Sequence, residues 1–130
     1  MTKERFNSLS GQVLNACVTV HKELGPGLLE SIYDLCLQNE MRHNGIAIES
    51  QVSIPLTYRG EVLPKDFRID ILVEGEIIVE VKAVERILPV HQAQLISYLK
   101  LANKRLGLLV NFNVAVMKDG FQRFVNKFPD

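Results

Sequence analysis

The sequence predicts one α/β domain of the α+β type, in which helices flank a mixed central sheet across residues 1–130. Three observations predict this class: two amphipathic helical segments open the chain, strand-like alternation follows them, and a third helical segment precedes a final apolar run. A chain of 130 residues can bury a core without disulfide or metal. Its 47% hydrophobic and 23% charged content excludes a disordered, collagen-like or coiled-coil chain.

Helices are expected to form the N-terminal third of the domain. The first covers residues 8–24 and ends at Gly25-Pro26-Gly27, because glycine suits a left-handed cap and proline cannot continue a helix. The second begins at Leu28 or Leu29 and runs to Asn44, where Gly45 ends it.

Strands are expected to follow, and they frame the third helix. Residues 59–61 read as a turn and residues 63–66 as irregular chain. Glu74-Gly75-Glu76 reads as a tight hairpin turn. The predicted order is α-α-β-β-β-α-β with a short final edge strand; its remaining elements are strands at 52–58, 67–73, 77–83, 106–112 and 121–125 and a helix at 90–104.

Charge and cysteine content restrict the classes of function. Fifteen basic residues balance fifteen acidic ones, so the net charge gives no attraction to nucleic acid, and such a function must depend on a local site. Cys17 and Cys36 lack metal-ligand spacing, so we expect two buried, reduced thiols; a single disulfide is the alternative. We see no signal peptide and no apolar run of ~18 residues, which predicts a cytoplasmic protein without a membrane partner.

The predicted hairpin brings two acidic side chains together. With a three-residue loop, Asp70 lies opposite Glu80, and Lys82 follows on the same face. Two such charges ~5 Å apart repel by roughly 3 kcal/mol at an effective dielectric of about 20, so the pair indicates a site for a divalent cation, Mg²⁺ or Mn²⁺. A solvated, exposed face is the alternative. The other face is predicted to be wholly apolar and comprises Phe67, Ile69, Ile71, Val73, Ile77, Val79, Val81 and Ala83.

Two further groups of polar residues are candidates for the same site. Glu30 lies in the first turn of the second helix, where a carboxylate also complements the helix dipole. His91, Gln94 and Tyr98 form one polar stripe of the third helix at positions i, i+3 and i+7. They are either hydrogen-bonding groups that face the cleft or ordinary boundary residues of an amphipathic helix.

These motifs together resemble a known family. Gly27 to Tyr33 matches the GxxExxY signature after which a family of small prokaryotic proteins is named, and the hairpin, the third helix and Leu106–Phe112 also look like that family. The family is grouped with the PD-(D/E)XK nuclease-like superfamily, which has a restriction-endonuclease-like α-β-β-β-α-β core. Gln94 and Tyr98 resemble the QxxxY motif of its RecB-type exonuclease branch. Ile69, and not proline, precedes Asp70, which is a departure that the superfamily tolerates.

The resemblance implies a metal-dependent nuclease that hydrolyses phosphodiester bonds of nucleic acid, DNA before RNA. The implied metal ligands are Asp70, Glu80, the Val81 backbone carbonyl and Glu30, directly or through water, and Lys82 completes the catalytic group. Gln94, Tyr98 and His91 would orient the site or the nucleic acid. The alternative is a catalytically silent binding or scaffolding module, and self-association as a homodimer is also expected. Candidate groups that attract substrate are Lys65, Arg68, Arg86, Lys100 and Lys104.

Overall fold

The computed structural model describes all residues from Met1 to Asp130. The chain order is as predicted, with one added 3-10 turn. The elements are α1 (Lys3–Leu24), α2 (Glu30–His43), β1 (Ile48–Tyr58), β2 (Glu61–Val73), β3 (Ile77–Lys82), α3 (Pro89–Leu101), β4 (Leu106–Asn111), η1 (Met117–Gly120) and β5 (Phe121–Val125).

The five strands form one mixed sheet in the order β1-β2-β3-β4-β5. Only β3 and β4 pair in parallel, and α3 supplies the crossover between them. All other neighbours are antiparallel, and β5 pairs only with β4, which confirms the predicted edge strand. The central strands β3 and β4 are therefore buried on both faces, as their apolar runs predict.

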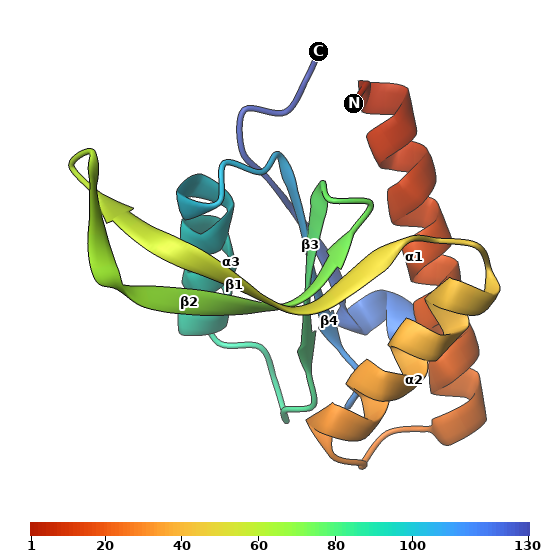
Figure 1. The fold of residues 1–130 in the computed structure, drawn as a ribbon. Helices are drawn as coiled ribbons and strands as arrows, with labels where there is room; N and C mark the ends of the chain where they lie inside the picture. The colour runs from red at the N-terminus through yellow and green to blue at the C-terminus, as the bar shows by residue number, and fades with distance from the viewer.

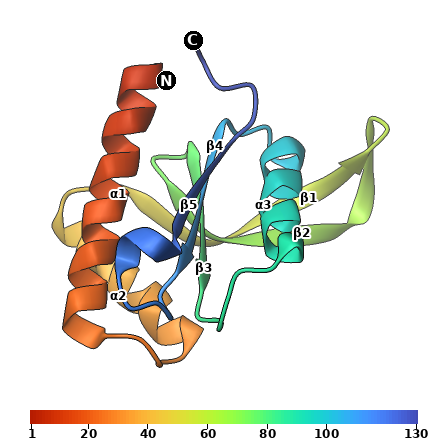
Figure 2. The same cartoon turned by 180° about the vertical axis from the view of Figure 1, so that it is seen from behind.

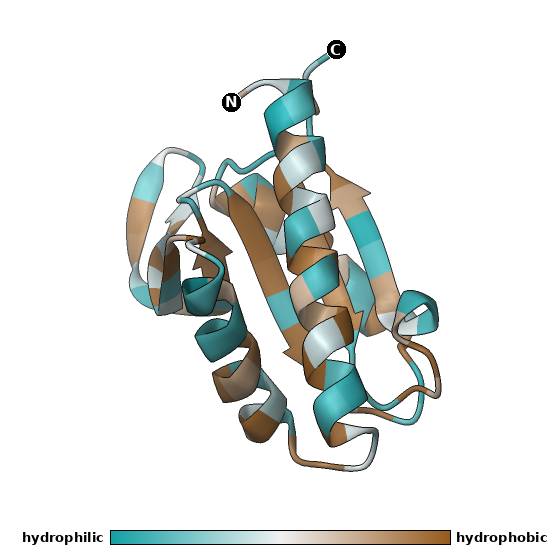
Figure 3. Ribbon diagram, turned by 90° about the vertical axis from the view of Figure 1, so that its right-hand side faces the viewer, coloured by the Kyte–Doolittle hydropathy of each residue, from teal (hydrophilic) through white to brown (hydrophobic).

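Helices cover the two faces of the sheet unequally. Figure 1 shows α1 and α2 on one side of β3 and β4 and α3 on the other, and Figure 2 shows the same layers from behind. Figure 3 looks onto α1 and α2 and shows brown, apolar positions recurring between teal, polar ones along α1. The larger core lies under these two helices. A smaller core lies under α3, where Leu95 packs so closely on Gly107 that a Cβ there would collide with it.

At Gln51 and Asp70, the apolar side chains of β1 and β2 switch from one side of the sheet to the other. Ile71 joins the α1–α2 core, whereas Ile69 and Phe67 join the α3 core, and Ile48 and Val52 divide in the same way on β1. Gln51 has a φ of 52°, and the continuous pairing skips the step between Gln51 and Asp70. The prediction that Phe67 and Ile69 share a face with Ile71 is therefore wrong, because the strands twist through this irregular step.

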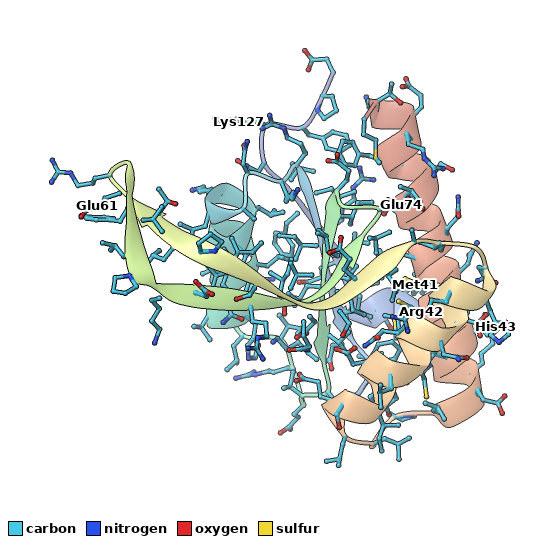
Figure 4. The ribbon with its side chains drawn as sticks, viewed as in Figure 1. Met41, Arg42, His43, Glu61, Glu74 and Lys127 are labelled. Carbon is cyan, nitrogen blue, oxygen red and sulfur yellow. The ribbon has the colours of Figure 1, made fainter.

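Past this step the two strands continue as a ribbon over α3, and Figure 4 labels Glu61 at its outer tip. Residues 63–66, predicted as irregular, belong to β2. The register shift between Pro55 and Thr57 accommodates the prolines of this ribbon, which alternation alone does not reveal.

Smaller departures concern helix ends and the cysteines. The first helix begins at Lys3 and not at residue 8, because the Thr2 side chain caps it by accepting the Arg5 N–H at 3.1 Å. Both cysteines are free as predicted; Cys17 is buried, whereas Cys36 is only half-buried. No helix combines the length and the apolar content that crossing a membrane requires.

Candidate active site

The β2–β3 hairpin has the predicted register. Ile71 faces Val79, Leu72 faces Ile78 and Val73 faces Ile77 across a three-residue turn that starts at Glu74. The regular pairing stops at Ile71 and Val79, one step before Asp70 and Glu80. The site therefore begins where the backbone ladder between these strands ends.

Carboxylates take over the hydrogen bonding at this point. Asp70 Oδ2 accepts the N–H of Val81 at 2.9 Å, and Glu80 Oε1 accepts the N–H of Asp70 at 3.4 Å. Asp70 is half-buried, and only 4% of Glu80 is exposed. The two acids are thus held against each other where the β2–β3 ladder ends.

Burial and its neighbour change the acidity of Glu80. Loss of water, followed by the charge of Asp70 and a hydrogen bond between the two carboxyl groups, raises the pKa of Glu80 to about 9, against a smaller lowering by Lys82. At neutral pH the Glu80 carboxyl group therefore keeps its proton. A divalent cation would replace that proton and would neutralise the repulsion between the two ionised carboxylates.

Lys82 ends β3 and lies half-buried beside the acids. Its charge lowers the pKa values of both Glu80 and Glu30, so its ammonium group lies within electrostatic reach of both. Its carbonyl accepts the N–H of Phe112 at 2.9 Å, which ties this end of β3 to β4. The predicted grouping of Asp70, Glu80 and Lys82 is present in the structure.

Tyr33 explains how Glu30 reaches the site. Its ring is fully buried and stacks on Phe112 with centroids 4.7 Å apart. Its hydroxyl donates to the Gly25 carbonyl at 2.5 Å and accepts the Leu28 N–H at 3.1 Å. This clamp fixes the loop before α2. The start of α2 and the end of β3 lie at the same end of the molecule, low in Figure 1.

Glu30 itself is exposed at the mouth of the site. Its pKa is raised mainly by partial loss of water, and further by Asp70 and Asp34, while Lys82 and His91 oppose the rise. Glu30 and Asp70 line a cleft of about 270 Å³, together with Ser31, Asp34, Leu35, Gln38, Ser50 and Gln51.

Asp34 is a site residue that the sequence reasoning missed. It is 9% exposed and accepts a hydrogen bond from Gln38 Nε2 at 2.5 Å. Burial raises its pKa most and the charge of Asp70 raises it further, whereas the hydrogen bond from Gln38 lowers it. Glu30, Asp34 and Gln38 follow one another at four-residue spacing on α2. That polar stripe was the available signal.

The polar stripe of α3 divides. Tyr98 stacks on Phe67 at 4.7 Å, and burial and then the charges of Glu80 and Asp70 raise its pKa, so it borders the acidic pair. His91 lies within electrostatic reach of Glu30, but its Nδ1 accepts the Leu88 N–H at 2.9 Å and caps α3. The Gln94 side chain is exposed and makes no hydrogen bond within the protein.

One of the basic residues predicted to attract substrate has a structural role at the other end of the sheet. Lys104 Nζ donates to the carbonyl of Gly75 in the β2–β3 turn at 2.8 Å. Figure 4 places the neighbouring Glu74 in that turn, remote from the end of β3. The remaining four are exposed: Lys65, Arg68, Arg86 and Lys100.

The donor set suits Mg²⁺ or Mn²⁺ held by few protein ligands. No three His, Cys, Asp or Glu side chains lie close enough together to hold a metal ion. Mg²⁺ commonly keeps several waters and takes only one or two carboxylates, which the opposed Asp70 and Glu80 supply. The two carboxyl groups lie side by side, since each accepts a backbone N–H from the other's strand. The residues therefore fit a hard divalent cation.

Comparison with known proteins gives one match. A family model described as the PD-(D/E)XK nuclease superfamily matches residues 7–124. No curated protein and no solved structure matches the chain. The match spans α1 to β5 and includes every residue of the site described above.

Proposed function

The chain belongs to the PD-(D/E)XK nuclease superfamily, and on this premise we propose that it is a metal-dependent nuclease that hydrolyses phosphodiester bonds. The observation that carries the proposal is the Asp70–Glu80 pair, held where the β2–β3 ladder ends and accompanied by Lys82. Like charges opposed on neighbouring strands are destabilising, so their presence is best explained by a task that needs them.

We assign the residues the following roles. Asp70 and Glu80, with the Val81 carbonyl, would hold the cation, and Glu30 would assist through a water molecule. A bound Mg²⁺ or Mn²⁺ would supply Lewis acidity at the scissile phosphate. Lys82 would orient the attacking water and stabilise the charge that develops on the phosphate. Asp34 would add a further carboxyl group to the α2 side of the cleft.

The residues of α3 would position the substrate. Tyr98 borders the acids, and Gln94 is exposed one turn before it, free to contact a nucleic-acid strand. The resemblance of this pair to the QxxxY motif supports a place in the GxxExxY family and the RecB-type branch, and it favours DNA over RNA as the substrate. His91 would contribute its Nε2 from the start of the helix.

A catalytically silent scaffold is the second candidate. The zero net charge of the chain favours it, because most nucleic-acid binders carry a basic surface. Such a module could act as a homodimer through β1, whose outer edge is unpaired. The two free thiols agree with the reducing, cytoplasmic location that we propose for either candidate.

Turnover of labelled nucleic acids tests the proposal. Purified protein is incubated with single- and double-stranded DNA and RNA, with Mg²⁺, with Mn²⁺ and with a chelator. We expect metal-dependent cleavage by the wild type, DNA before RNA, and none by Asp70→Asn. Absence of cleavage on all four substrates with both metals would favour the scaffold.

A further inference from the structure

The Asn111 side chain hydrogen-bonds the backbone that follows Lys82 at the end of the parallel β3–β4 ladder. It is the last residue of β4, faces Lys82 in the parallel ladder, and has 2% of its surface exposed. Its Oδ1 accepts the N–H of Val84 at 3.1 Å, and its Nδ2 donates to the Val84 carbonyl at 2.9 Å. One buried side chain thus supplies both hydrogen bonds that a neighbouring strand would have given, two residues beyond Lys82.

The Asn111 amide is itself fixed. The Asn113 N–H donates to the same Oδ1 at 3.2 Å, and the Asn113 side chain adds a longer bond of 3.4 Å to the Val84 carbonyl. Behind it, Gly120 packs so tightly that a Cβ would collide with the Asn111 carbonyl oxygen. Rotation of the amide would break three hydrogen bonds in a buried place, which is costly.

The chain after Lys82 depends on this clamp. Residues 83–87 make no backbone–backbone hydrogen bond, although they connect β3 to α3. Before Lys82, the chain is held by the bond from Val81 to Asp70. After it, Asn111 supplies the corresponding restraint through Val84, so the Lys82 backbone is held on both sides.

We propose that Asn111 is the positioning residue for Lys82. It holds the chain that follows β3 against the end of β4 through Val84, and thereby keeps the Lys82 ammonium group beside the Asp70–Glu80 pair. Misplacement of a reacting group by about 1 Å can cost on the order of 100-fold in rate, so a restraint of this kind matters for catalysis. The catalytic part of this inference rests on the proposed nuclease function, whereas the restraint on Lys82 does not.

Asn126 provides a matched control at the opposite end of β4. Its Nδ2 also binds backbone carbonyls, those of Lys104 at 3.0 Å and Leu99 at 3.4 Å. Asn126→Ala therefore removes a similar clamp far from the site. Asn111→Ala removes the clamp on Val84. Asn111→Asp has almost the same size, keeps the acceptor and replaces the Nδ2 donor with a carboxyl oxygen, so it serves if the alanine variant does not fold.

The first measurement needs no substrate. Amide exchange at Val84 and NMR relaxation of the Lys82 side chain are compared between variants of confirmed fold. In Asn111→Ala we expect exchange at Val84 to become roughly tenfold faster and the order parameter of the Lys82 side chain to fall, with neither change in Asn126→Ala. Asn111→Asp keeps the acceptor of the Val84 N–H, so it should lower the order parameter of Lys82 with little change in exchange at Val84. An unchanged Lys82 order parameter, or an equal fall in Asn126→Ala, would overturn the inference.

The second measurement uses the activity. We expect the Asn111 variants to lose roughly 10- to 100-fold in kcat with KM within about twofold of the wild type, while Asn126→Ala keeps both. A raised KM with unchanged kcat would mean that Asn111 serves substrate binding and would overturn its positioning role. If the wild type cleaves nothing, the proposed function fails, and the NMR result alone decides whether Asn111 restrains Lys82.

Discussion

The two ends of β3 are built differently, although the strand is only six residues long. At the Ile77 end, backbone ladders pair the strand with β2 and β4, and the side chains on both faces are apolar and buried. At the Lys82 end, β2 has left the ladder, and Asp70 and Asn111 bind the backbone with their side chains. The first end is a core and the second is a site.

The difference shows how one strand combines stability with chemistry. Breaking the ladder frees peptide groups for side chains and lets two acids approach each other, at a cost in repulsion and desolvation. The regular end bears that cost, since it lies in the larger hydrophobic core. Substitutions at the Ile77 end should therefore abolish folding, whereas substitutions at the Lys82 end should abolish function and leave the fold intact.

The largest effect is expected at the regular end. Val79→Asp would bury an unpaired charge in the core, so the protein should not fold at all, which a missing thermal transition in circular dichroism would show. Val62→Asp at the ribbon tip, where 67% of the side chain is exposed, is the matched control and should melt like the wild type. Equal melting of both variants would refute the division between the ends.

At the irregular end, Lys82→Ala should remove catalysis without removing the fold. We expect at least a 100-fold loss of cleavage, since an electrostatic stabiliser of the reacting phosphate is lost, with a melting temperature within a few degrees of the wild type. Lys3→Ala removes an exposed lysine at the start of α1, to which no role in the site is assigned, and should retain full cleavage. Undiminished cleavage by Lys82→Ala would exclude the assigned mechanism.

The buried acid predicts a dependence of stability on pH. The pKa of Glu80 is about 9 in the folded protein and near its usual 4.5 when unfolded, so the folded state alone keeps the proton between these values. Its contribution to the free energy of unfolding is full below pH 4.5 and is lost as pH rises toward 9, by at most ~1.4 kcal/mol per unit.

Urea unfolding of metal-free Glu80→Gln at pH 5.5 and pH 8 tests this point. The variant lacks the titration, so it should gain stability relative to the wild type as pH rises, and it should also lose cleavage. Glu85→Gln changes an exposed residue of the following loop and should keep the wild-type slope. Parallel pH profiles of Glu80→Gln and the wild type would contradict the burial of this acid.

Sequence patterns predicted the regular parts of the molecule well. The three-residue turn at Glu74 fixes the register of the hairpin, so the opposition of Asp70 and Glu80 follows from counting residues. The order of the elements follows from the change of period along the chain. The nuclease superfamily was also recognisable from motifs, because several of them agree along the chain.

The irregular parts could not be predicted in this way. Period-two counting assumes an unbroken strand, so it assigned Phe67 and Ile69 to the wrong face when the chain twisted at Asp70. It also gave no reason to connect Asn111 with Val84, because that bond depends on where a loop passes in space. Asp34 was missed because its place in the site depends on the packing of α2 beside Asp70, which the sequence does not show.

Metal-dependent melting tests the central claim, that the Asp70–Glu80 pair is a cation site. Metal at about ten times its Kd should stabilise the wild type by roughly 1.4 kcal/mol, or on the order of 5 °C in melting temperature. Because it replaces one of the two carboxylates with a neutral amide, Asp70→Asn should lose most of the response. Asp119→Asn, an exposed change on η1, should keep it. We expect the melting temperature of the wild type to rise in millimolar Mg²⁺ or Mn²⁺; a wild type unaffected by either metal, even with a short oligonucleotide present, would contradict a cation site at this pair.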